Sequence, residues 1–571
     1  MTTPTAQLAE LADEYFALFT EAAPVAATMY GIPGHDDAVP DVSESAQADI
    51  ARRMANIRDR TDALDADQLT DTERTTRALL RHECQAMINA HTSHELEWAI
   101  GRYAGPISMV LSAVPKVLLT DDARAADYYH RCAKLPAYLE QWVDRLRDGR
   151  AQGFVPNRRS VELALGQLDG YLASSPGDDP LLAPCQPAEH ARVRAKLTTL
   201  VAERMRPAMA RIRQLIHDEL LPAARPDTRC GVMHLPNGPE IYLDAVRQHT
   251  TTERTPHELH ETGLRLGRQV REELRSVGVR VFGTDEFTEI IRLLREDPGL
   301  RYATSDEIVR DATGALRRAE EALPDWFGRW HRAPCEIGQM NAVEGATAVP
   351  GYYQPPGSDG SRPGRFWVNT SGPGSRCRHE TEALTFHESV PGHHLQFAVA
   401  QELTGLPEFR RFAYVSAFGE GWGLYAERLA DEMGLYSDDR ARLGMLSFDA
   451  MRAARLVVDT GIHAAGWSRD RAIDYMWRHT AVPMGTIVNE VDRYINWPGQ
   501  ALAYMTGRLE IDALRETGRA ELGSRFQLKE FHDALLGAAS IPLSELRVVL
   551  HRWAASRDIT RSPHATDVAP G

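Results

Sequence analysis

The densest group of chemically reactive side chains lies in ALTFHESVPGHHLQ, residues 383–396. It begins like the zinc-peptidase pattern His-Glu-x-x-His, in which two imidazoles one helical turn apart bind the metal. Pro391 stands where the second histidine belongs, and His393 and His394 come six and seven residues after His387. On a regular helix that separation is roughly 9–10 Å along the axis, too long for two ligands of one ion at about 2 Å each. A regular helix therefore cannot form this site.

Pro391 and Gly392 offer a way to restore the spacing. Proline removes a main-chain donor and clashes with the preceding turn, and glycine adopts conformations that are closed to other residues. A break at this dipeptide could bring His393 or His394 back beside His387. The alternative is that His387 ends a helix and that the two later histidines are capping or exposed groups. Both interpretations stay open on these residues alone.

A third ligand is available in SAFGEGWGLYAERLA, residues 416–430. Glu420 lies 27 residues after His393 on a predicted helix, and Glu427 follows seven residues later on nearly the same face. The neighbours of Glu420 are apolar residues and glycines, a poor environment for an unpaired charge. We therefore predict Glu420 as a ligand and Glu427 as a group that supports the site.

Asp459 and His463 are four residues apart in RLVVDTGIHAAGW, so they share one face of a predicted helix. We predict that Asp459 orients a ligand or the substrate and that His463 takes part in catalysis. The alternative is a hydrogen-bonded pair inside the core.

Five further side chains are candidates for contact with a substrate. Tyr504 can donate a hydrogen bond to an oxyanion without carrying charge itself. Arg362, Arg493 and Arg508 can each bind a carboxylate in bidentate fashion, although a single arginine is more often a surface ion-pair partner. Tyr353 lines the predicted cleft or packs beneath it.

These groups must be positioned mainly by helices. Apolar residues recur at three- and four-residue spacing over 6–19, 46–90, 121–150 and 189–221, and the pattern returns after residue 380. The sequence predicts a mainly α fold, a large two-lobed helical body with a central cleft. We divide it into a helical region (1–230), a catalytic region (231–560) and a tail (561–571).

Two stretches, 230–251 and 340–370, are rich in Gly, Pro, Val and aromatic residues, which suits short strands joined by turns. In the second, MNAVEGATA and RFWVNT could form an antiparallel hairpin just before the histidine motif. A strand at the edge of such a hairpin can bind an extended peptide through main-chain hydrogen bonds. The alternative is a surface hairpin without a ligand.

The composition limits the partners. The chain has 571 residues and a formal net charge of -15, which argues against nucleic-acid and anionic-membrane surfaces. The six cysteines show no C-x-x-C pair, and we see no apolar run of about 20 residues. We expect a cytoplasmic protein whose partner is a peptide or a small amide.

Several motifs occur together and in order: HESVPGHHLQ, EGWGLYAE, RLVVDTGIHAAGW and RYINWPGQALAYMTG, accompanied by DGSRPGRFWVNT and FHDALLGAASIPLSEL. This set resembles the bacterial domain-of-unknown-function family 885 over essentially the whole chain. That family resembles helical zinc peptidases of the carboxypeptidase Taq, thimet oligopeptidase and angiotensin-converting-enzyme kind.

The resemblance implies one zinc ion held by His387, by His393 or His394, and by Glu420. It favours His393, because the Gly-His pair at 392–393 matches the pair that closes the peptidase motif. Glu388 would act as general base and Tyr504 would stabilise the oxyanion. The leading hypothesis is a zinc-dependent hydrolase of peptide or peptide-like amide bonds. The alternatives are a tailoring enzyme for a small amide or amino-acid-derived metabolite, and a catalytically degenerate peptide-binding protein.

Overall fold

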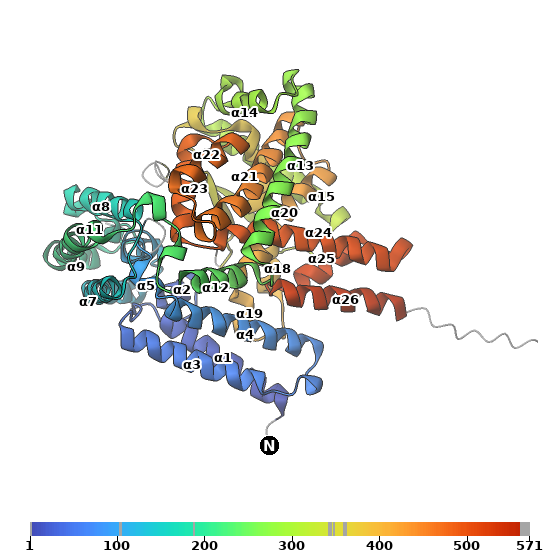
Figure 1. The fold of residues 1–571 in the computed structure, drawn as a ribbon. Coiled ribbons are helices and arrows are strands. Elements are labelled where there is room, and N and C mark those ends of the chain that lie inside the picture. Colours follow the sequence, from blue (N-terminus) through green and yellow to red (C-terminus); the bar gives the residue numbers. More distant parts are fainter. Residues whose placement is uncertain are drawn as a thin grey trace, which may run out of the picture.

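The computed structural model describes residues 3–101, 105–186, 189–340, 345, 349–357 and 362–559. The chain is mainly α-helical with one small three-stranded sheet, as the sequence predicts (Figure 1). In the described part of the chain, every helix is too short or too polar to cross a membrane.

The N-terminal region consists of helices only, in two groups. Figure 1 shows α1, α3 and α4 as one layer beneath α12, and α7, α8, α9 and α11 gathered at one side of the molecule. Side-chain caps begin several of these helices, for example Thr3 at α1 and Asp121 at α7. The bounds are α1 (Pro4–Ala22), α2 (Pro24–Tyr30), α3 (Glu44–Asp62), α4 (Asp71–Thr92), α5 (Glu95–Trp98), α6 (Pro106–Ser108), α7 (Asp122–Gln152), α8 (Arg158–Ala173), α9 (Ala191–Leu200), α10 (Arg206–Leu215) and α11 (Leu221–Ala223).

The segment at 230–251, where we expected short strands, contains a helix instead. Ile241, Tyr242, Val246 and Thr250 are buried in α12, at a spacing that places them on one face. The Gly-Pro pair at its start suggested a turn, but proline fits the first turn of a helix because its missing N–H has no helical partner there. The helices that follow up to the sheet are α12 (Gly238–Thr250), α13 (Pro256–Phe282), α14 (Phe287–Glu296) and α15 (Ser305–Trp326).

The sheet comprises β1 (Cys335–Gln339), β2 (Gly351–Gln354) and β3 (Gly364–Val368), in the order β1-β3-β2. β2 pairs with β3 antiparallel, with Tyr353 opposite Phe366, and β1 pairs with β3 in parallel. The predicted antiparallel partner of RFWVNT is therefore corrected from MNAVEGATA to β2. Most of MNAVEGATA, at 341–344 and 346–348, lies outside the described residues.

The C-terminal half packs long helices around a central one. α21 is buried on all sides over most of its length, α13 lies along it, and α20 lies along α24. The helices are α17 (Thr381–Glu388), α18 (His393–Glu402), α19 (Glu408–Phe412), α20 (Ser416–Glu432), α21 (Asp439–His463), α22 (Arg469–His479), α23 (Met484–Asn496), α24 (Ala503–Leu522), α25 (Leu528–Gly537) and α26 (Leu543–Ile559).

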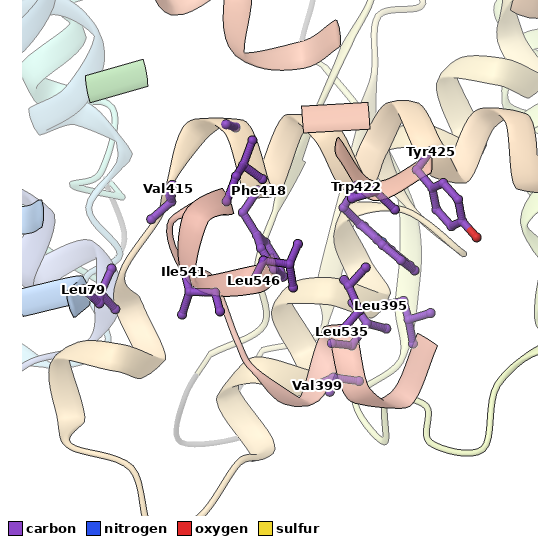
Figure 2. Close-up of a cluster of buried hydrophobic side chains, with 14 of the residues drawn as sticks. Leu79, Leu395, Val399, Val415, Phe418, Trp422, Tyr425, Leu535, Ile541 and Leu546 are labelled. Atoms are coloured by element: carbon purple, nitrogen blue, oxygen red, sulfur yellow. The ribbon is translucent and has the colours of Figure 1, made fainter. Parts of the chain in front are cut away.

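The helix that carries Glu420 is anchored by a large apolar core. Phe418 and Trp422 of α20 lie with Leu395 and Val399 of α18 and with Leu535 of α25 in this core (Figure 2). Burial of such side chains stabilises each by roughly 1.5–3 kcal/mol. This core therefore holds α18 and α20, which both supply predicted ligands, in one rigid arrangement.

Candidate metal centre

The break predicted at Pro391 and Gly392 is present, and it separates α17 from α18. The helix ends at Glu388, a cis peptide bond joins Val390 to Pro391, and α18 begins at His393. Gly392 is required here, because a Cβ at this position would overlap the main-chain oxygens of Phe386 and His387. Across this break, the imidazole of His393 lies beside that of His387, with the ring centroids 4.8 Å apart.

The break brings His387 and His393 together with Glu420 of α20. The Nε2 atom of each histidine lies 3.6 Å from Oε2 of Glu420. The ligand atoms of the three residues all lie within 4.8 Å of one another. Two imidazole nitrogens and one carboxylate oxygen are a donor set that zinc accepts in catalytic sites, where a fourth position stays open.

The imidazole of His387 is held in one orientation. Its Nδ1 lies 2.8 Å from Oε1 of Glu427, whose side chain is 0% exposed. A carboxylate on one ring nitrogen fixes the tautomer and leaves the other nitrogen for a metal. The space for the ring exists because residue 423 is glycine: a Cβ there would lie 2.5 Å from Cε1 of His387. Glu427 therefore contacts His387 directly, and its support of a bound metal stays a prediction.

Two contacts that we did not predict orient the other ligands. Nδ1 of His393 lies 3.3 Å from Oε1 of the buried Gln396, three residues later on the same helix. Tyr414 donates a hydrogen bond of 2.8 Å to Oε1 of Glu420 and leaves Oε2 facing the histidines. The spacing in HHLQ was a signal for Gln396, whereas nothing in the sequence singled out Tyr414.

The electrostatics favour a cation between these groups. Burial opposes protonation of His387, but contacts with Glu420 and Glu427 outweigh it and raise the pKa of His387 to about 9. Burial alone would raise the pKa of Glu420, yet His387 and His393 hold that pKa well below its usual range. The carboxylates therefore favour positive charge at this point, which a divalent ion would supply without a proton on His387.

The centre opens into a cavity of about 460 Å³ between the helices and the sheet. Glu388 lies in its wall, and burial raises the pKa of this carboxyl. Among the residues that we predicted, the lining includes His387, Glu388, His393, Glu420, Tyr353, Arg493 and Tyr504.

Arg455 is a lining residue that the sequence did not indicate. Its Nη2 donates to Oε2 of Glu490 at 2.7 Å, and Nη2 of Arg493 donates to the same oxygen at 3.0 Å. The Arg455 guanidinium also lies over the Tyr504 ring, 4.4 Å from its centroid. Two guanidiniums share one carboxylate, which leaves one surplus positive charge at this wall.

His394 is turned away from the centre. Its Nδ1 lies 2.9 Å from the Tyr353 hydroxyl and its Nε2 lies 3.0 Å from the main-chain oxygen of Ala333. Because both ring nitrogens have partners elsewhere, the geometry selects His393 from the two candidates.

Four other predicted residues lie outside the cavity lining. Asp459 accepts hydrogen bonds from the Tyr242 hydroxyl and the main-chain N–H of Gly499, and His463 bonds the main chain of Val232 and Tyr494. Both side chains are therefore buried core groups outside the cavity lining, and the roles that we predicted for them stay predictions. Arg508 forms a buried ion pair with Asp449 at 2.8 Å. Arg362 lies in the connection between β2 and β3.

The sequence matches a family described as bacterial protein of unknown function, DUF885, over residues 24–550. The chain belongs to this family. A solved structure titled "putative lipoprotein from Colwellia psychrerythraea" is similar, with a TM-score of 0.92 and 25% identity over 97% of this chain and 100% of that chain. A second one, from Shewanella oneidensis and titled "putative lipoprotein of unknown function", has a TM-score of 0.73 and 18% identity over 95% of this chain and 99% of that chain. No protein of curated function is significantly similar.

Both of these proteins are described as "putative lipoprotein", whereas we expected a cytoplasmic location for the present chain. That description applies to those two proteins, and the location of this chain stays a prediction.

Proposed function

We propose that this protein is a zinc-dependent hydrolase of peptide or peptide-like amide bonds. The observation that carries the proposal is the convergence of His387, His393 and Glu420, with ligand atoms within 4.8 Å, at the wall of a 460 Å³ cavity. Their donor types fit zinc with one open coordination position. The helical zinc peptidases that the sequence motifs resemble use the same kinds of ligand.

Each residue at the cavity has a role in this proposal. When bound, zinc would polarise the amide carbonyl and acidify water. Glu388 would accept the proton of the attacking water and return it to the leaving amine, a task that its raised pKa favours. Burial also raises the pKa of Tyr504, so its phenol keeps the proton with which it would hydrogen-bond the oxyanion.

The substrate would lie against β2. This strand is at one edge of the sheet, and Gly351, Tyr352 and Tyr353 line the cavity. An extended chain could hydrogen-bond to that edge. The surplus charge of Arg455 and Arg493 beside Glu490 suits a carboxylate of the substrate.

The test is turnover by the zinc-loaded protein on a quenched-fluorescence peptide library and on a panel of small amides. Glu388→Gln is the matched control, because it should remove turnover and keep the zinc. Cleavage of peptides supports the proposal, and cleavage confined to small amides would identify a tailoring enzyme instead. If neither the wild type nor Glu388→Gln cleaved any substrate, and both bound peptides equally well, the protein would be identified as a peptide-binding protein.

A further inference from the structure

A second group of metal-ligating side chains lies where the chain approaches α17. Cys377, His379 and Glu380 offer a thiol, an imidazole and a carboxyl whose ligand atoms lie within 4.8 Å of one another. Nε2 of His379 is 3.9 Å from Oε1 of Glu380. His379 and Glu380 belong to a single 3-10 turn that continues directly into the helix of His387.

His379 is the observation that points to a ligand. Its side chain is buried, with 3% of the residue exposed, and neither ring nitrogen has a hydrogen-bond partner among the described residues. Buried polar groups without partners are rare and unfavourable, so an unpaired imidazole calls for an explanation. The turn cannot move away easily, because α21 packs on it so closely at Gly444 that a Cβ there would overlap the His379 carbonyl.

The surroundings of the cluster suit a metal-bound thiolate. Nη1 of Arg301 donates a hydrogen bond of 2.9 Å to Sγ of Cys377. Hydrogen bonds to the sulfur are a usual outer contact of metal-bound thiolates, and they tune such sites.

Cys377 and Glu380 also line the main cavity, so a fourth coordination position would face that cavity. Two anionic ligands and one neutral imidazole match a divalent ion that accepts sulfur, nitrogen and oxygen. Because Arg301 already offsets part of the negative charge, we expect weaker binding here than at the site of His387.

We propose that Cys377, His379 and Glu380 bind a second divalent, thiophilic metal ion such as zinc. Glu380 precedes His387 by seven residues of continuous helical chain, which is roughly 10 Å along the axis. The two ions would therefore not form a bridged pair, in which the metals lie about 3.5–4 Å apart. The second ion would fix the start of α17, the helix that carries His387 and Glu388. The inference does not depend on the hydrolase activity.

Cobalt provides the test, because a thiolate bound to Co²⁺ gives a sulfur-to-metal charge-transfer band in the near ultraviolet. The His387 centre contains no thiolate, so titration of the reduced, metal-free full chain with Co²⁺ reports this band from the second site alone. We expect the band in the wild type and in the control Cys335→Ser, its absence in Cys377→Ser, and at least tenfold weaker binding in His379→Gln.

Elemental analysis of zinc-loaded protein completes the test. We expect two zinc ions per chain in the wild type and in Cys335→Ser, and one in Cys377→Ser. A double variant, His387→Ala with His393→Ala, should lose one zinc and keep the cobalt–thiolate band, which separates this inference from the proposed function. The inference would be overturned if the wild type bound a single zinc that the His387→Ala, His393→Ala variant lost. An unchanged band in folded Cys377→Ser or His379→Gln would overturn it as well.

Discussion

Replacement of Gly423 by alanine tests whether the His387 imidazole must occupy its observed position to bind metal. The new Cβ would lie 2.5 Å from Cε1, 2.8 Å from Nδ1 and 2.9 Å from Nε2 of that ring, where ordinary contact begins at 3.4 Å. The ring is buried and its Nδ1 is held at 2.8 Å by Glu427. It must therefore shift by roughly 1 Å, several times the tolerance of about 0.2 Å in a metal–ligand distance.

Loss of a ligand's orientation typically lowers metal affinity by about 10–100-fold. We therefore expect Gly423→Ala to weaken zinc binding by that factor, which corresponds to about 1.4–2.8 kcal/mol. The assay is a competition titration against a chromogenic zinc chelator at fixed pH. It is best done in a Cys377→Ser background, so that only the His387 centre is measured.

The matched control is Gly267→Ala in α13, where an added Cβ meets nothing within 4 Å. Removing a glycine from a helix interior stabilises it by about 1 kcal/mol, so this variant should unfold at higher denaturant with unchanged zinc affinity. If Gly423→Ala bound zinc within twofold of Gly267→Ala, the argument from the packing of His387 would be refuted.

Three further outcomes are expected. Glu388→Gln should lower kcat by at least about 100-fold at unchanged zinc content, and loss of the zinc would contradict its role as a base. Tyr504→Phe should lower kcat by about 100-fold with little change in KM, and an unchanged kcat would exclude the oxyanion contact. Burial raises the pKa of Asp459 from 3.8 to about 7, although hydrogen bonds from Tyr242 and Gly499 oppose the shift. The unfolded chain therefore loses this proton first, and the group destabilises the fold as pH rises from 4 to 7. In urea titrations across that range, Asp459→Asn should gain roughly 2–4 kcal/mol of unfolding free energy relative to the wild type, and a constant difference would contradict the shift.

The helical fold could be predicted because helices carry a strong periodic signal in apolar residues. The break between His387 and His393 could also be predicted, since proline and glycine are the residues that interrupt a helix. The residues alone left the choice between His393 and His394 open, and only the family resemblance favoured His393, because contacts remote in sequence direct the turn. Nε1 of Trp422 donates to the main-chain oxygen of Pro391 at 2.9 Å, about 30 residues away in the chain.

The remaining differences have similar physical causes. Asp459 and His463 do share a helix face, but α21 is buried all round, so the shared face did not identify the cavity side. Arg455 reaches the cavity only through the packing of α21 against α23, and nothing local distinguishes it from the other arginines. The parallel pairing of β1 with β3 joins segments far apart in the sequence, whereas a hairpin is a local structure.

The most direct test of the central claim is a crystal structure of the zinc-loaded protein with anomalous data collected at the zinc absorption edge. We predict an anomalous peak between Nε2 of His387, Nε2 of His393 and a carboxylate oxygen of Glu420, at roughly 2.0–2.2 Å from each. His394 should stay bonded to Tyr353 and Ala333. A zinc-loaded crystal with no peak at these three residues, or with His394 as the ligand in place of His393, would contradict the account.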